Sequence, residues 1–89
     1  MNLNFPNASR SFEAKRNRVR FWGYDSALEI TFFVESSLLM KLCPDCGQGE
    51  AGVLKAFDAM IERIHGAAQK AYKGSRERSD IFVLAEAQF

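Results

Sequence analysis

The sequence predicts a two-layer α+β domain in the order β-β-β-α-α-β, with one short and one long helix packed on one face of the sheet. Residues 28–34 alternate between two faces, as a half-buried strand does. Residues 50–73 instead carry apolar side chains at helical spacing. Because 89 residues leave room for only one core, we expect a single domain over residues 1–89.

Three strands are expected in the first half of the chain. Residues 1–10 are rich in Asn, Ser and Pro without a period, which indicates an irregular lead-in. Residues 11–14 fit a short edge strand, and residues 19–24 carry the β-branched and aromatic side chains of a longer strand. Residues 28–34 follow after a turn, so the three strands form an antiparallel meander.

The helices and the last strand follow. Ser36 and Ser37 are N-cap candidates for a short helix that Pro44 ends. One continuous helix is expected over residues 50–73, ended by Gly74. Its apolar stripe consists of Val53, Phe57, Met60, Ile61, Ile64, Ala68 and Ala71. Residues 81–85 form a fourth strand that is apolar on both faces, which predicts an inner position in the sheet.

These segments together resemble a known family. The segments that carry the likeness are Asn4-Phe5-Pro6-Asn7, Val19-Arg20-Phe21-Trp22-Gly23-Tyr24, Ile30-Thr31-Phe32-Phe33-Val34, the long helix and Phe82-Val83-Leu84. The chain resembles, over nearly its whole length, the small bacterial proteins catalogued as domain of unknown function 1488. The resemblance implies an α+β fold and no activity, because the family has no assigned catalytic or binding residues.

Charge and composition exclude several classes of protein. The formal net charge is +1, so no global field attracts nucleic acid or an anionic membrane. No apolar run approaches the roughly 18 residues of a membrane span, and the N-terminus lacks the pattern of a signal peptide. We therefore expect a cytoplasmic protein without a membrane partner, whose two cysteines are thiols.

Cys43 and Cys46 have the spacing at which two cysteines share a metal or form a redox disulfide. A redox cysteine usually begins a helix, whereas Cys43 follows one, and a zinc site would need more ligands than His65 supplies. Two loop thiols, a redox pair and a metal shared between subunits all remain open. Glu62 and His65, with Asp58 one turn earlier, have the spacing of di-iron bundles, but without a second motif they indicate a solvated helix face.

Four cations, Lys15, Arg16, Arg18 and Arg20, lie close to aromatic residues around the first long turn. Cations beside stacking surfaces are typical of proteins that bind single-stranded nucleic acid. The near-zero net charge and the absence of a known nucleic-acid-binding signature favour an ordinary hairpin turn. Nucleic-acid binding is kept as an alternative.

The alternation of the strands places aromatic residues on the face opposite the helices. Trp22, Tyr24 and Phe33 share this face and are flanked by Arg20 and Glu29. Exposed aromatic residues in a group usually mark an interface. Three occupants are considered: the lead-in, which would cover the face through its apolar residues Leu3 and Phe5; a second copy; or another partner.

These observations favour a non-enzymatic binding or accessory domain that forms a homodimer through this face, with no cofactor and no catalytic residue. The first alternative is a thiol-based redox or metal-binding protein that uses Cys43 and Cys46. The second is a nucleic-acid accessory protein that uses the basic hairpin.

Overall fold

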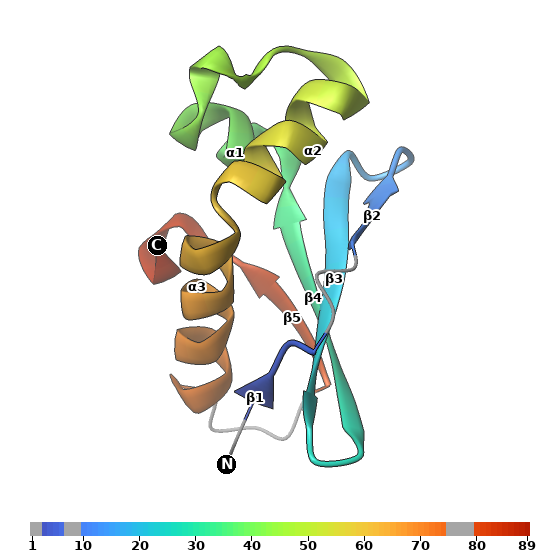
Figure 1. Ribbon diagram of the computed structural model, residues 1–89, viewed down its shortest axis with the longest axis vertical. Helices are drawn as coiled ribbons and strands as arrows, with labels where there is room; N and C mark the ends of the chain where they lie inside the picture. The colour runs from blue at the N-terminus through green and yellow to red at the C-terminus, as the bar shows by residue number, and fades with distance from the viewer. Residues whose placement is uncertain (1–2, 7–9, 75–79) are drawn as a thin grey trace.

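The computed structural model describes residues 3–6, 10–74 and 80–89. It shows a twisted sheet with three helices against one face, so the predicted α+β class is confirmed (Figure 1). The described strands are β1 (Leu3–Asn4), β2 (Arg10–Glu13), β3 (Arg18–Asp25), β4 (Leu28–Glu35) and β5 (Ile81–Leu84). The helices are α1 (Ser36–Leu42), α2 (Gly49–Ala59) and α3 (Ile61–Gly74).

The predicted meander is observed, since β2, β3 and β4 pair in antiparallel order. The expectation of an irregular lead-in is wrong at Leu3–Asn4, because these residues form β1, which pairs with β3 on the same side as β2. β5 pairs parallel to β4, so the main order is β1-β3-β4-β5. The predicted inner position of β5 is wrong among the described strands, because it lies at the edge. The reason is topological: β1 and β2 occupy the far side of β3, so a returning strand can pair only with the open side of β4.

The expected continuous helix over residues 50–73 is also wrong in detail, because it is divided into α2 and α3 at Met60. Met60 has φ −111° and ψ 22°, yet its N–H still donates to Ala56 O at 3.1 Å, and Ile64 N–H donates to Met60 O at 2.9 Å. The chain changes direction there, so that α2 packs on β3 and α3 on β5 (Figure 1). The bend contains no Pro or Gly, so the local sequence does not predict it.

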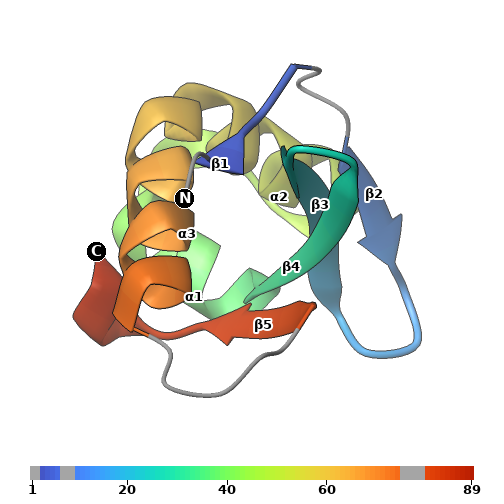
Figure 2. The same cartoon turned by 90° about the horizontal axis from the view of Figure 1, so that it is seen from below.

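The core lies between the sheet and the helices, and Figure 2 shows the strands curving around them. Its fully buried large side chains are Val19, Phe21, Ile30, Phe32, Val34, Leu39, Phe57 and Ile64. Strand alternation predicts that Val19, Phe21, Leu28, Ile30 and Phe32 face the helices, and all of them are buried except Leu28, which is 54% exposed at the β3–β4 turn. Phe21 stacks on Phe32 at 5.3 Å and meets Phe57 edge-on at 5.3 Å, a favourable arrangement of aromatic rings.

The start of α1 differs from the predicted capping pattern. Glu35 occupies the N-cap position, and its side chain makes no capping hydrogen bond. Ser36 is the first helical residue, and its buried hydroxyl has no hydrogen-bond partner among the described residues. Its backbone N–H instead donates to Asn17 O at 3.0 Å, which ties α1 to the β2–β3 turn. The end of α1 at Leu42 agrees with the stop expected ahead of Pro44.

Candidate functional site on the outer sheet face

The face of the sheet opposite the helices carries the residues predicted for an interface. Arg20 pairs with Phe33, Trp22 with Thr31, and Tyr24 with Glu29 across β3 and β4. Because side chains alternate, all of these point away from the core. We call the group the aromatic face: Arg18, Arg20, Trp22, Tyr24, Glu29, Thr31 and Phe33, with Ile81 and Val83 of β5.

β5 adds two aliphatic side chains that the sequence reasoning did not assign to the site. Ile81 lies opposite Thr31 and Val83 opposite Phe33. Their exposed fractions are 57% and 54%, among the largest of the apolar residues described. The sequence did carry a signal for them. Residues 81–84 are apolar on both faces of the strand, a pattern that predicted an inner strand but is also consistent with an exposed apolar edge.

Phe33 is not a free ring on this face. It is only 8% exposed, because the Arg18 guanidinium lies 3.5 Å from the centre of its ring. Arg18 is held in place by Glu13, which accepts a hydrogen bond from Nε at 2.8 Å. The structure thus places a cation over the ring that was expected in water, while Trp22 and Tyr24 remain partly exposed.

Arg20 lies across the centre of the aromatic face with few partners of its own. Its guanidinium is 5.3 Å from the centre of the Trp22 ring, and its Nη2 is 4.0 Å from Glu29 Oε1. An exposed ion pair at that distance contributes little to stability. Arg20 Nε is buried and has no hydrogen-bond partner among the described residues. The face therefore contains a donor that is already removed from water and is not satisfied.

The lead-in does not cover this face with the two residues proposed for it. Leu3 belongs to the core. Phe5 contacts Phe21 and Phe32 at 6.0 Å each and stacks on His65 of α3 at 4.0 Å, all on the helical side of the sheet. Gly23 leaves the space for this ring, because a Cβ there would lie 2.8 Å from Phe5 Cε1. Cover by Leu3 and Phe5 is therefore wrong.

The predicted basic cluster is divided between two places. Lys15 and Arg16 are exposed in the β2–β3 turn, whereas Arg18 and Arg20 lie on the aromatic face with the contacts described above. Arg76 and Arg78, two further cations that could extend this cluster, lie outside the described part of the chain. Nucleic-acid binding by the hairpin stays a prediction.

Cys43 and Cys46 form a disulfide, which differs from the expectation of two thiols. Both residues are half-buried and pack against the core at the corner between α1 and α2. The missing signal was spatial: the short 3₁₀ turn Pro44–Cys46 brings their Cα atoms to 5.6 Å, a normal separation for a disulfide.

Asp58 and His65, two of the polar residues of the predicted long helix, contact different partners. Both oxygens of Asp58 accept hydrogen bonds from Arg10, at 2.8 Å each. His65 stacks on Phe5, and burial lowers its pKa below the usual 6.5. Within the described residues, no group of three His, Cys, Asp or Glu side chains is placed to hold a metal ion.

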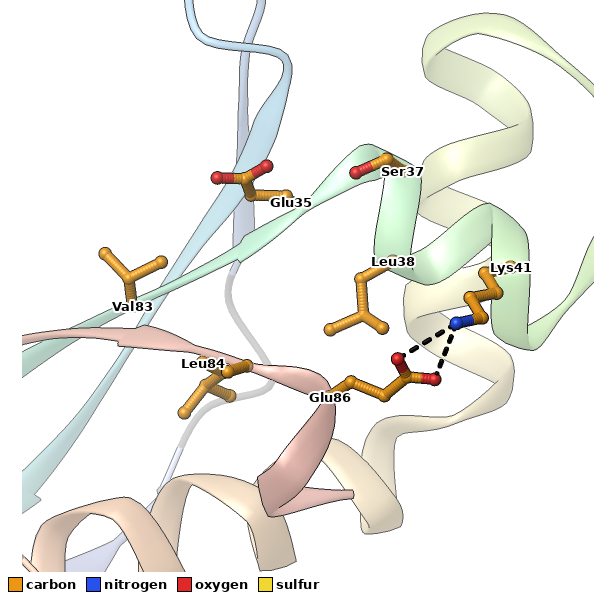
Figure 3. A pocket seen from close by; sticks show the side chains of 8 residues that line it. Glu35, Ser37, Leu38, Lys41, Val83, Leu84 and Glu86 are labelled. Carbon is orange, nitrogen blue, oxygen red and sulfur yellow. Dashed lines mark hydrogen bonds and ion pairs between the residues drawn. The ribbon is translucent and has the colours of Figure 1, made fainter.

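An open cavity of about 440 Å³ borders the aromatic face at the end of β5 (Figure 3). Its lining residues are Glu35, Ser37, Leu38, Lys41, Val83, Leu84, Ala85 and Glu86. The Lys41 ammonium bridges both oxygens of Glu86 at 2.9 Å, as the dashed lines show (Figure 3). The charges of this pair balance each other, and Glu35 adds a second carboxylate to the lining. It was not anticipated from the sequence.

The fold and the outer face define a small α+β protein with a mixed aromatic and aliphatic surface. The family described as "Protein of unknown function (DUF1488)" matches residues 3–84, and the chain therefore belongs to this family. No curated protein shows significant sequence similarity to it. No helix in the described residues is long and apolar enough to cross a membrane.

A solved relative has the same fold. It is the crystal structure of a protein of unknown function from the DUF1488 family of Shewanella loihica PV-4, which superposes with a TM-score of 0.75. The match covers 94% of each chain at 13% sequence identity. At that identity the likeness defines the architecture and carries no activity.

Proposed function

We propose that this domain is a non-enzymatic binding module that forms a homodimer through the aromatic face. The observation that carries the proposal is the continuity of Trp22 and Tyr24 with Ile81 and Val83 across three paired strands. Aromatic side chains are enriched at interface centres, and their polar tips tolerate water in the free monomer. Large apolar groups gathered on one side of a small domain are typical of a contact surface.

The charges of the face fit a second copy of the same chain. Arg20 and Glu29 place both signs on this surface, and each remains more than two-fifths exposed. A two-fold contact sets each patch against itself, so a surface with both signs is self-complementary.

The size of the face indicates a weak dimer. Strands of up to eight residues at about 3.4 Å each, and three strands about 4.8 Å apart, give a footprint of roughly 400 Å². Standard stable interfaces bury roughly 800 Å² on each partner. We therefore expect a weak, reversible dimer and not a permanent one.

Analytical ultracentrifugation over a concentration series tests this proposal. The wild type should pass from monomer to dimer at micromolar concentration, and the fluorescence of Trp22, the one tryptophan of the chain, should become less accessible to iodide across the same range. Trp22→Ala should shift the equilibrium toward monomer by at least about tenfold, as expected for an interface anchor, with an unchanged far-UV circular dichroism spectrum.

Leu28→Ala is the matched control. Leu28 is as exposed as Val83, but the alternation of β4 places it on the opposite side of the sheet from Trp22. Its removal should leave the association constant unchanged. A wild type that stays monomeric at high micromolar concentration, with Trp22 equally accessible throughout, would contradict the proposal. So would equal effects of the two substitutions.

A further inference from the structure

We propose that Cys43 and Cys46 are a reversible two-electron thiol–disulfide couple, whose oxidised form clamps the corner between α1 and α2 and which exchanges with small dithiols. This proposal is independent of the one for the aromatic face. It assigns a chemical role to the corner between α1 and α2, whose residues are not part of that face.

The corner is held from both sides by the backbone. Cys43 N–H donates to Leu39 O at 2.9 Å and so closes the last turn of α1. Cys46 N–H donates to Cys43 O at 3.2 Å within the 3₁₀ turn. Beyond it, Gly47 lies so close to Gly52 in the first turns of α2 that a Cβ on Gly52 would be 2.4 Å from Gly47 C. The disulfide therefore joins residues that other contacts already hold near each other.

Because those contacts do not involve sulfur, the dithiol form fits the same fold. The disulfide closes a loop of only four residues, the short-loop limit in which constraining the unfolded chain stabilises least. Reduction should therefore weaken the corner without unfolding the domain. A couple that is folded in both states can cycle, whereas a disulfide on which folding depends cannot.

The two cysteines are accessible to small thiols and can form only one intramolecular disulfide. Cys43 and Cys46 are half-buried, and their neighbours Pro44, Asp45 and Gly47 are exposed, so a small thiol can approach. The chain contains no other cysteine, which excludes internal reshuffling. When disulfides occur in a reducing compartment, they are usually transient, catalytic or redox-sensing. The cytoplasm that the sequence predicts for this protein is such a compartment.

The exchange proceeds in two balanced steps. A thiolate of the small dithiol attacks one sulfur of the disulfide, which forms a mixed disulfide and releases the other cysteine as a thiolate that takes up a proton. The second thiol of the reductant then displaces the remaining cysteine. The protein gains two electrons and two protons, and the dithiol becomes a cyclic disulfide. Since Cys43 ends α1, where the helix carbonyls disfavour a negative charge, we expect slow equilibration rather than rapid turnover.

The test is a redox titration of the full-length protein with dithiothreitol under native conditions, with free thiols trapped by iodoacetamide and counted by intact mass. The oxidised protein should carry no adduct and the reduced protein two, in a single two-electron transition that is reversed by the oxidised reagent. Reduction should lower the melting temperature by at most about 15 °C.

The double variant Cys43→Ser/Cys46→Ser is the control. It should be folded, melt near the temperature of the reduced wild type and show no response to reductant. Three results would overturn the proposal: a disulfide that is reduced only when the protein unfolds, two thiols that oxidised glutathione fails to join, or a stable glutathione adduct in place of the intramolecular bond.

Discussion

Two helical glycines differ in one measurable respect, the space available to a side chain. An added Cβ on Gly52 in α2 would lie 2.4 Å from Gly47 C and 2.6 Å from Gly47 O. At Gly66 in α3 the same atom would meet nothing within 4 Å. The substitutions Gly52→Ala and Gly66→Ala therefore make the same chemical change in two helices with opposite steric consequences.

The magnitudes follow from two opposing terms. Replacing Gly by Ala inside a helix gains about 0.8–1.0 kcal/mol in propensity, and at Gly66 nothing opposes that gain. At Gly52 the clash is with backbone atoms, which have no other rotamer to adopt, and overpacking of this kind costs about 1–3 kcal/mol or more. We expect Gly66→Ala to stabilise by about 0.5–1 kcal/mol and Gly52→Ala to destabilise by about 1–2 kcal/mol.

Urea unfolding followed by circular dichroism measures both changes. For a domain of this size the two variants should also differ in melting temperature by roughly 10 °C. Part of the loss in Gly52→Ala should disappear under reducing conditions, because the segment next to Cys46 can then move away from α2. If Gly52→Ala were as stable as Gly66→Ala, the close approach of Gly47 to α2 would be refuted.

Three further predictions concern the core and its edges. Phe57→Ala should cost about 3–5 kcal/mol in urea unfolding, because a fully buried ring leaves a cavity, and a loss below about 1 kcal/mol would contradict its place in the core. Burial lowers the pKa of His65. As the pH falls, the imidazole is therefore protonated in the unfolded chain before it is protonated in the folded protein. Wild-type stability should therefore be full above pH 6.5 and fall as the pH drops through and below that value, whereas thermal unfolding of His65→Phe should show a shallower decline over the same range. Tyr72→Phe removes the hydroxyl that donates to Asp25 Oδ2 at 2.6 Å and should cost about 1 kcal/mol. Asp25→Ala removes the acceptor of the same bond, so the double variant should lose less than the sum of the two single variants, whereas an unchanged melting temperature of Tyr72→Phe would contradict the bond.

The sequence by itself predicted the strands of the meander, the last strand, the short helix and the faces of the central strands. The alternation of residues 28–34 predicted the side of the sheet that holds Ile30 and Phe32, and with it the pairing that brings Trp22 and Phe33 to the other side. The pairing register was predictable because a shift of residues 28–34 by one position would bury Glu29. The antiparallel meander likewise follows from local patterns.

The tertiary structure decided the features that depend on neighbours distant in the chain. A strand that is apolar on both faces is typical of an inner position in a sheet. β5 nevertheless lies at the edge, because β1 and β2 pair with the far side of β3 and leave only the open side of β4. The bend at Met60 allows α2 and α3 to pack on different strands. Arg18 lies over the Phe33 ring, and Glu13 holds it there by accepting a hydrogen bond from its Nε. The closure of the Cys43–Cys46 pair required a backbone turn that spacing alone does not specify. Period and propensity are local properties, whereas strand order, helix direction and side-chain cover are set by competition for the same space.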